Sequence, residues 1–489
     1  MMETKHILAL IIFMALGSIG VLCTLLSQRA RDAALFFMVV GAVMMGRMDV
    51  NFFGEAWYRG TSRGVEMTLV DLAAWSLLIA TVLLPRYRGG RIYWPAGLGL
   101  MTLYFAYCTF SVVTSDPKLF GMWELTKVLR GLIVFVTAAL FIRGRRELMV
   151  LVLALGCAVG VEMVYGVEQR IWKGLQRIPG TLGHENSLSM YLCTVGPVLL
   201  AAALSDWPKW IRWFAGACCV MAAVLVVMTL SRAGIPIFAV VMTGTALFCT
   251  TWRITRGKVF AGALTFAGVA LLLLTSWNAL VMRFTQASFH DEFLKEDAIE
   301  TRGVYWRIVF AIAEEEPYGV GLNNWSYAVS KYYGPQLGYL YDDYDVVRWD
   351  PEKELTAETN HAPPAHSLAV ITWGELGLPG LCIFGLLWLR WFQVGASFLR
   401  RRLDADPLYR LGIGLWFGAM GLFCQSITEW TYRQTSIMFT FHVMMGALAS
   451  LYYAKRFAAA PRAEELDETP EEIEIEATPV PVAAWRSHR

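Results

Sequence analysis

The sequence has few charged residues and almost no net charge. Charged residues make up 17% of its 489 residues, and 42 Lys and Arg are balanced by 40 Asp and Glu. Soluble domains carry about 25% charged residues, so this composition excludes an ordinary soluble enzyme. A net charge of +2 is also too small to suggest nucleic-acid binding, and no basic domain stands out along the chain. The chain is instead 56% hydrophobic, as expected for a protein that is solvated by lipid.

Several catalytic motifs are missing as well. Neither a Gly-rich Walker loop nor a His-Glu-x-x-His sequence is present, which argues against an ATP-driven pump and a zinc protease. All nine cysteines lie in apolar runs, so we interpret them as small core residues and not as disulfides or metal ligands. They are Cys23, Cys108, Cys157, Cys193, Cys218, Cys219, Cys249, Cys382 and Cys424.

Long apolar runs recur along the chain. A membrane span needs roughly 20 apolar residues of helix, and thirteen runs approach this size. They lie near residues 7–26, 33–46, 68–84, 93–113, 128–142, 148–165, 188–204, 210–229, 235–251, 260–280, 368–392, 411–427 and 437–453. The first is too long for the apolar core of a signal peptide, so it is predicted to be a retained span. The expected fold class is all-α, a polytopic membrane-spanning helical bundle.

Lys and Arg gather in every second connection between these runs. They are Arg29, Arg31, Arg86, Arg88, Arg91, Arg143, Arg145, Arg146, Lys209, Arg212, Arg253, Arg256, Lys258, Arg400, Arg401, Arg402, Lys455 and Arg456. Because positively charged connections stay in the cytoplasm, the amino terminus is predicted to lie outside and the carboxyl terminus inside.

Two segments outside the apolar runs differ in character. Residues 281–366 form one long outer loop, which is acidic at first and then aromatic, and which is long enough to be functional. The tail 457–489 is rich in Glu and Asp and is predicted to be disordered in the cytoplasm. We divide the chain into amino-terminal spans (1–176), a central region that contains the outer loop and the candidate catalytic residues described below (177–395), carboxyl-terminal spans (396–456) and the tail.

The first candidate site is the tight connection between the eighth and ninth spans. Here Arg232 must lie at the outer mouth of the bundle, between Ser231 and Gly234, which opens the ninth span. A guanidinium group and the backbone amides of a helix start can both donate to diphosphate oxygens. The alternative is that Arg232 only reaches towards lipid headgroups.

The second candidate is His366, which opens the eleventh span and is followed by Ser367. At 100° per residue, Gly377 lies about 20° and Gly380 about 40° from the direction of His366, so both glycines lie below the histidine on one helix face. Such a face permits the close approach of a neighbouring helix or of a polyprenyl tail whose headgroup reaches His366. A single histidine is otherwise more often structural than catalytic.

The third candidate lies within the long outer loop. Val304, Ile308 and Ile312 recur at helical spacing, which predicts an amphipathic helix at the outer membrane interface. Arg302, near the start of this helix, and Arg307 can then face the mouth of the bundle. An interfacial anchor without chemistry is the alternative.

The fourth candidate is the loop that precedes the seventh span. Asn186 or Ser187 is predicted to cap the helix that follows. Capping explains these residues, but His184 and Glu185 are also possible acid or base groups.

Two further sets of carboxylates leave other chemistry open. Asp343 and Asp345 could hold a divalent cation on a diphosphate, although two aspartates at this spacing are common by chance. Asp71, Glu162 and Glu375 lie in apolar runs and leave a transporter possible.

Four of these segments, in their order along the chain, resemble the O-antigen ligase family, which also includes O-antigen polymerases and protein O-oligosaccharyltransferases. They are residues 179–187, 231–234, 302–321 and 366–380. The last fits the family pattern His, Asn/Ser/Gln, nine residues, Gly-x-x-Gly, with His366 and Ser367 in the leading positions. The resemblance covers roughly residues 180–389, and the amino-terminal spans match only in being hydrophobic.

The resemblance implies a GT-C-like inner-membrane glycosyltransferase of 12–13 spans with one long periplasmic loop, although the family norm is about twelve spans and an inner amino terminus. Members transfer a glycan from undecaprenyl diphosphate to a hydroxyl group at the periplasmic face, inverting the anomeric centre without a metal, a cofactor or a nucleotide sugar. The resemblance assigns Arg232 and Arg302 to the diphosphate and His366 to the acceptor hydroxyl. Further candidates for substrate binding are Arg307, Ser367, Ser231, Asn186, His184, Gly377 and Gly380.

Three activities fit this sequence. A ligase would transfer a finished glycan to lipid A core or to another lipid, glycan or protein acceptor in lipopolysaccharide biosynthesis, and the His366 pattern favours it. A polymerase would join lipid-linked repeat units of an O antigen or exopolysaccharide. A polysaccharide flippase or transporter fits less well. The expected partners are the lipid-linked donor, the acceptor and the bilayer, without nucleic acid.

Overall fold

The computed structural model describes residues 4–55, 58–84, 93–251, 256, 281, 302–338, 362–400 and 404–458. The predicted tenth span, Asp343, Asp345, much of the long outer loop and nearly all of the acidic tail lie outside these residues, as does the side chain of Arg302. The predictions that concern them stay predictions.

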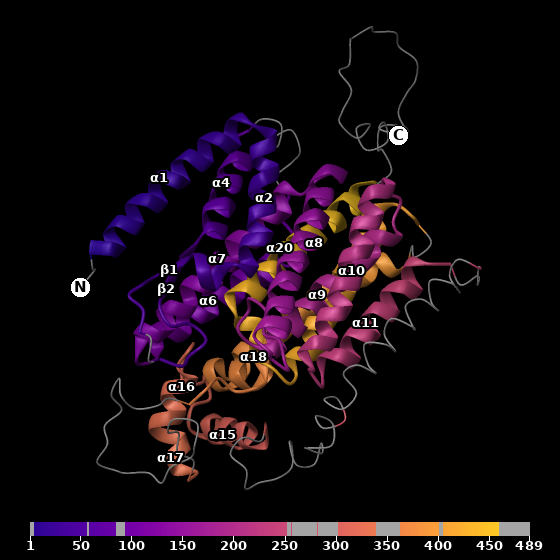
Figure 1. The fold of residues 1–489 in the computed structure, drawn as a ribbon. Coiled ribbons are helices and arrows are strands. Elements are labelled where there is room, and N and C mark those ends of the chain that lie inside the picture. Colours follow the sequence, from indigo (N-terminus) through magenta and orange to yellow (C-terminus); the bar gives the residue numbers. More distant parts are fainter. Residues whose placement is uncertain are drawn as a thin grey trace, which may run out of the picture.

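Nearly all of the regular secondary structure in the described part of the chain is helix (Figure 1). Its principal helices are α1 (Thr4–Leu26), α2 (Gln28–Val43), α3 (Met45–Met48), α4 (Leu69–Leu83), α6 (Leu98–Thr114), α7 (Lys118–Phe141), α8 (Arg145–Val167), η1 (Glu168–Trp172), α9 (Glu185–Leu204), α10 (Lys209–Thr229), α11 (Gly234–Cys249), α15 (Arg302–Glu315), α16 (Trp325–Ala328), η2 (Val329–Tyr333), α17 (Gly334–Gln336), α18 (Leu368–Leu399), α19 (Pro407–Ser426), η3 (Thr431–Arg433) and α20 (Thr435–Ala458). Two short strands, β1 (Asp49–Phe52) and β2 (Val65–Thr68), pair antiparallel with Asp49 opposite Thr68. This strand pair was not predicted.

The helices confirm a polytopic all-α membrane protein. Among the described residues, seven helices are long and apolar enough to cross a membrane. They are α1, α8 continuing into η1, α9, α10, α18, α19 and α20. The apolar helices α4, α6 and α11 are shorter. Each predicted span except the tenth coincides with a described helix, and α2 and α7 account for the second and fifth.

Helix α7 begins well before the span that hydropathy predicts. It starts at Lys118 rather than near residue 128. Glu124 and Lys127 are charged and directly precede the apolar run in the sequence. Both are nevertheless buried in the helix, with Lys127 Nζ 2.6 Å from Glu124 Oε2. Lys127 Nζ also donates to the carbonyl of Thr61 at 3.0 Å. The two charges satisfy each other, so the helix continues through a segment that hydropathy alone would exclude.

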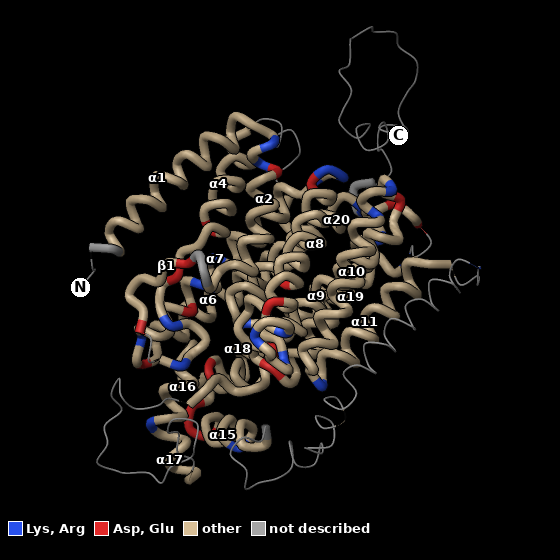
Figure 2. Tube along the Cα trace, in the orientation of Figure 1, with Lys and Arg blue, Asp and Glu red and all other residues tan. Residues whose placement is uncertain are grey.

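Connections that are predicted to be cytoplasmic meet at one end of the bundle. Arg146 Nη2 lies 2.5 Å from Asp32 Oδ2 at the start of α2, and Arg145 Nη2 lies 3.4 Å from Asp406 Oδ1 at the start of α19. Figure 1 shows α15, α16 and α17 at the opposite end, and Figure 2 shows charged residues mainly towards the two ends. These three predicted cytoplasmic connections therefore lie together at one end of the bundle.

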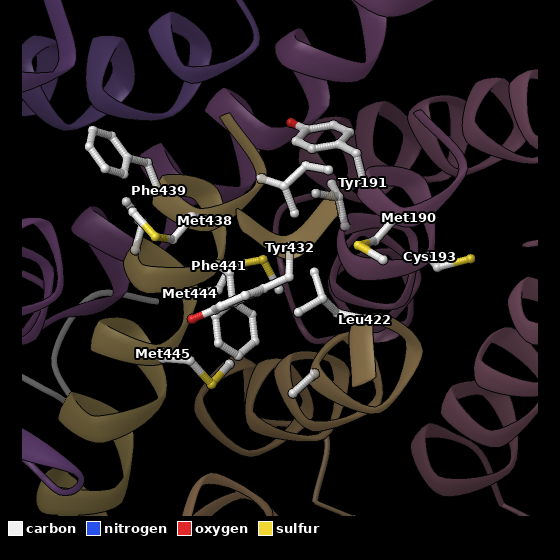
Figure 3. Close-up of a cluster of buried hydrophobic side chains, with 14 of the residues drawn as sticks. Met190, Tyr191, Cys193, Leu422, Tyr432, Met438, Phe439, Phe441, Met444 and Met445 are labelled. Atoms are coloured by element: carbon white, nitrogen blue, oxygen red, sulfur yellow. The ribbon is translucent and has the colours of Figure 1, made fainter. Parts of the chain in front are cut away.

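Helix α9 lies at the centre of the carboxyl-terminal half, against α10, α11 and α19. Gly414, Gly418 and Gly421 of α19 face it, and a Cβ at Gly418 would lie only 2.3 Å from the carbonyl oxygen of Thr194. Without side chains at these positions, the two helix backbones approach closely. Figure 3 shows the buried apolar cluster beside this contact, which includes Met190, Tyr191, Cys193, Leu422, Tyr432, Met438, Phe439, Phe441, Met444 and Met445.

The three carboxylates that left a transporter possible all have partners. The pairs are Asp71 with Arg130 (2.7 Å between Oδ2 and Nη2), Glu162 with the N–H of Thr181 (2.9 Å), and Glu375 with Arg433. Each carboxylate therefore has a structural explanation, and none of them favours a transporter.

Breaking the ion pair between Glu375 and Arg433 should destabilise the bundle. Burial by itself would lower the pKa of Arg433, but the Glu375 carboxylate outweighs this effect and raises the pKa above its usual value. We expect Arg433→Met to lower the free energy of unfolding by about 3 kcal/mol, because it leaves the Glu375 carboxylate buried without its counter-ion. Unfolding in detergent measures this loss. The double variant Arg433→Met, Glu375→Leu should recover most of it, and equal losses in the two variants would contradict the explanation.

Candidate active site

Three of the predicted site segments meet in one chain of hydrogen bonds. Ser231 Oγ donates to Asn186 Oδ1 at 3.0 Å, and Asn186 Nδ2 donates to Glu429 Oε1 at 2.7 Å. The second carboxylate oxygen, Glu429 Oε2, lies 3.0 Å from Nδ1 of His366. This chain, which we call the polar network, joins the α10–α11 hairpin, the start of α9, the connection after α19 and the start of α18. It therefore brings together residues that are far apart in the sequence.

The hairpin between α10 and α11 is as tight as predicted. Leu230 follows α10 in the left-handed region, with φ 50°, and α11 begins at Gly234. Ser231 Oγ accepts a hydrogen bond from the N–H of Gly234 at 3.2 Å. A Cβ at Gly234 would lie 1.6 Å from Ser189 Oγ of α9, so only glycine lets this end of α11 lie against α9. Arg232 is half-buried and directly precedes the amino-terminal end of α11.

The loop before α9 is fixed from α8 and η1. Gln169 exchanges two hydrogen bonds of 2.8 Å with the backbone N–H and carbonyl of Gly180. Glu162 accepts the N–H of Thr181 at 2.9 Å, and Thr181 Oγ1 also contacts its carboxylate. Gly180 has a φ of 64°, and a Cβ there would collide with the Glu162 carboxylate. These contacts define the path of the chain into the start of α9.

The capping residue of α9 differs from the prediction. His184 is the N-cap, and its Nδ1 accepts the N–H of Asn186 at 3.1 Å. The expectation that Asn186 or Ser187 caps this helix was therefore wrong. Helix α9 begins earlier than expected, at Glu185, so the imidazole supplies the acceptor and the Asn186 side chain joins the polar network instead. His184 Nε2 lies 3.8 Å from Glu185 Oε2.

His366 lies at the amino-terminal end of α18, as predicted. Ser367 is the N-cap of that helix, and its Oγ accepts the N–H of Val370 at 3.5 Å. The side chain of His366 is 35% exposed, whereas the Glu429 side chain beside it is only 4% exposed. The ring of Tyr305, on α15, lies 6.0 Å from the imidazole ring, measured between centroids. A buried carboxylate thus holds one side of His366 while the imidazole stays accessible.

The amphipathic helix predicted in the outer loop is confirmed as α15. Val304, Ile308 and Ile312 are all buried, and the helix packs against α18. Arg302 is its first residue, and Arg307 is exposed. The buried stripe explains the position of α15, and the roles of the two arginines stay predictions.

Helix α18 is kinked at Gly377, where φ is 63° and ψ is −176°. The kink leaves carbonyl groups just before Gly377 available to partners outside the helix. The N–H groups of Val320 and Gly321 donate to the carbonyls of Gly374 and Glu375, both at 2.9 Å. A positive φ favours glycine, which is why this residue type is needed at the bend.

The prediction that both glycines lie below His366 on one helix face was wrong, because α18 begins after His366 and the kink at Gly377 interrupts the helix. Protein groups nevertheless approach both glycines closely. A Cβ at Gly377 would lie 2.3 Å from the carbonyl oxygen of Pro317, and a Cβ at Gly380 would lie 2.9 Å from the ring of Tyr107. Of the two alternatives considered from the sequence, these contacts match a protein neighbour rather than a polyprenyl tail. A role of Gly377 and Gly380 in substrate binding stays a prediction.

Sequence reasoning missed the connection between α19 and α20. This connection contributes Glu429 to the polar network and Arg433 to the ion pair with Glu375. Both residues are charged and lie between two apolar spans in a predicted outer connection, so the criterion that identified Arg232 also applied to them. They were overlooked because no recognised motif covers the segment.

The geometry provides two kinds of chemistry at the end of the bundle where α15 lies. An imidazole whose Nδ1 meets a carboxylate can accept a proton through its other ring nitrogen. An arginine beside a helix amino terminus can bind an anionic phosphate group. Among the residues that the structure describes, no three His, Cys, Asp or Glu side chains lie together as they would to bind a metal ion.

Comparison with known proteins agrees with the motifs. A search of curated proteins gave no match to the chain. The family model described as O-antigen ligase matches residues 217–385, a range that includes Arg232, Arg302 and His366 but not Asn186 or Glu429. Residues 217–385 are therefore an O-antigen ligase family domain, which confirms the resemblance that the sequence motifs indicated.

Proposed function

We propose that the protein is a membrane glycosyltransferase of the O-antigen ligase type. It transfers a glycan from undecaprenyl diphosphate to an acceptor hydroxyl at the periplasmic face of the bacterial inner membrane. The class of reaction follows from the family domain at residues 217–385. The donor, the ligase activity and the membrane face are part of the proposal.

The observation that carries the proposal is the polar network. It joins the hairpin that holds Arg232 to His366 through Asn186 and Glu429, over contacts of 3.0, 2.7 and 3.0 Å. A transfer from a lipid diphosphate to a hydroxyl needs an anion-binding group and a proton acceptor in one site. If the arginine and the histidine were purely structural, hydrogen bonds through Asn186 and Glu429 would not be required between their segments.

The two groups divide the chemistry between them. As the bond from the anomeric carbon to the diphosphate breaks, negative charge grows on the leaving oxygen, so a fixed guanidinium and the amides of α11 stabilise the transition state more than the ground state. The acceptor hydroxyl attacks the anomeric carbon from the opposite face, which inverts it, and His366 accepts the hydroxyl proton. Arg302 is proposed as a second group on the diphosphate, and Arg307, Ser367 and His184 as contacts to the substrates.

The test uses the purified full-length protein in nanodiscs. It is given an oligosaccharide on undecaprenyl diphosphate, first alone and then with lipid A core, and the products are sized by mass spectrometry. We expect transfer only when the acceptor is added. Longer lipid-linked glycans without an added acceptor would identify a polymerase instead, and no transfer to lipid, glycan or protein acceptors would contradict glycosyl transfer.

A further inference from the structure

The carboxylate of Glu429 is buried between two groups of the proposed site. Its side chain is 4% exposed, and its two oxygens contact different partners, Asn186 through Oε1 and His366 through Oε2. Glu429 lies outside the range that matches the O-antigen ligase family model. The match therefore assigns it no role.

The contact with Glu429 determines which nitrogen of His366 can act on a substrate. An ionised carboxylate only accepts hydrogen bonds, so Nδ1 of His366 must carry the proton at the 3.0 Å contact. In a neutral imidazole, the lone pair then lies on Nε2. The partial exposure of His366 leaves the ring accessible. The buried carboxylate therefore sets both the tautomer and the orientation of the ring.

The amide of Asn186 transmits this constraint to the hairpin. Its nitrogen donates to Glu429, and its oxygen accepts from Ser231 Oγ, which in turn accepts the N–H of Gly234. The amide and the hydroxyl in this series each have a single orientation in which every donor faces an acceptor. The first N–H of α11, beside Arg232, is thus tied to the imidazole by a continuous series of hydrogen bonds.

We propose that Glu429 is a positioning residue for His366, and that Asn186 couples it to the Arg232 hairpin. This inference rests on the proposed function. The acceptor oxygen forms its bond to the anomeric carbon while the bond to the diphosphate oxygen breaks and that oxygen keeps the electron pair. The hydroxyl proton passes to Nε2 of His366, and the Glu429 carboxylate stabilises the resulting imidazolium without taking the proton.

The main test is Glu429→Gln in the nanodisc assay, with full kinetics for donor and acceptor. Glutamine keeps the shape but loses the charge, so kcat should fall on the order of 100-fold. Both KM values should stay within about twofold, because the residue touches neither substrate. Glu429→Asp should restore a large part of kcat, because it returns a carboxylate. The matched control is Glu147→Gln, a buried glutamate at the start of α8, which should transfer at the wild-type rate.

A second variant keeps the test informative if Glu429→Gln does not accumulate in the membrane. Asn186→Ala removes the bond to Glu429 and breaks the series to Ser231, so kcat should fall about tenfold while the thermal midpoint in detergent stays near that of the wild type. A kcat within threefold of wild type in the variant that accumulates overturns the proposal. So does a loss that moves kcat, both KM values and the midpoint together, because that pattern indicates a structural role. If the wild-type protein transfers no glycan, the proposed function itself fails.

Discussion

Replacing His366 with alanine should reduce glycan transfer about 10³-fold, with membrane insertion and expression near wild type. General-base catalysis contributes roughly 10² to 10⁴ to a rate, and the variant removes the imidazole that is proposed to accept the acceptor proton. The affinity for the lipid-linked donor should not change, because the diphosphate is assigned to other groups. Transfer to lipid A core, quantified by mass spectrometry at saturating donor, measures the effect.

His6→Ala provides the control for this experiment. His6 lies on α1, where its ring contacts Phe52, far in sequence from the polar network. This variant should keep the wild-type rate. Near-normal transfer by His366→Ala would remove the histidine from the mechanism and leave it as a structural residue at the start of α18.

Replacing Arg232 with alanine should reduce transfer by about 10² to 10³. This is the usual cost of losing one fixed group that stabilises developing negative charge. Unlike the His366 variant, Arg232→Ala should also weaken donor binding, because the diphosphate is already charged before the bond breaks. Arg232→Lys should recover only part of the rate, since an ammonium group keeps the charge but not the planar, bidentate geometry. Donor KM and kcat, measured separately, distinguish these effects.

Arg212→Ala is the matched control for Arg232. Arg212 lies in α10, the helix that leads into the Arg232 hairpin, near the end farther from that hairpin, and is exposed, with a hydrogen bond of 3.3 Å to the carbonyl of Ala203. Its loss should leave transfer unchanged. If Arg212→Ala and Arg232→Ala reduce the rate equally, the effect arises from the stability of α10 and not from binding of the diphosphate.

Much of the fold follows from local properties of the sequence. Apolar runs of span length predicted the membrane-spanning helices. In lipid, every backbone N–H and C=O group needs a hydrogen-bond partner within the protein, and a single helix provides these partners within its own segment. The stripe of Val304, Ile308 and Ile312 predicted α15, since one face of this helix had to be buried. The prediction was inaccurate at α7, because the buried pair of Glu124 and Lys127 lies in what hydropathy treats as a break.

The site was predicted only in part, because some of its residues carry no local signal in the sequence. Arg232 and His366 were found because each is a polar residue at the end of a span and lies in a motif with recognisable spacing. Asn186 was found, but its predicted role as a helix cap was wrong, since a cap can come from more than one side chain and the structure uses His184. Glu429 was missed, because its significance depends on partners 63 and 243 residues away along the chain.

The sequence alone determined that this is a multi-span helical membrane protein with an O-antigen ligase domain. Span length, basic connections and motif spacing each depend on residues that lie close together along the chain, so they can be recognised without the fold. Only the tertiary structure decided which polar groups meet. Close packing at Gly418 and Gly234 brings helix backbones together, and this packing sets the distances among Ser231, Asn186 and Glu429. A hydrogen bond depends on distances of about 3 Å, and such distances between remote segments arise only when the whole bundle has folded.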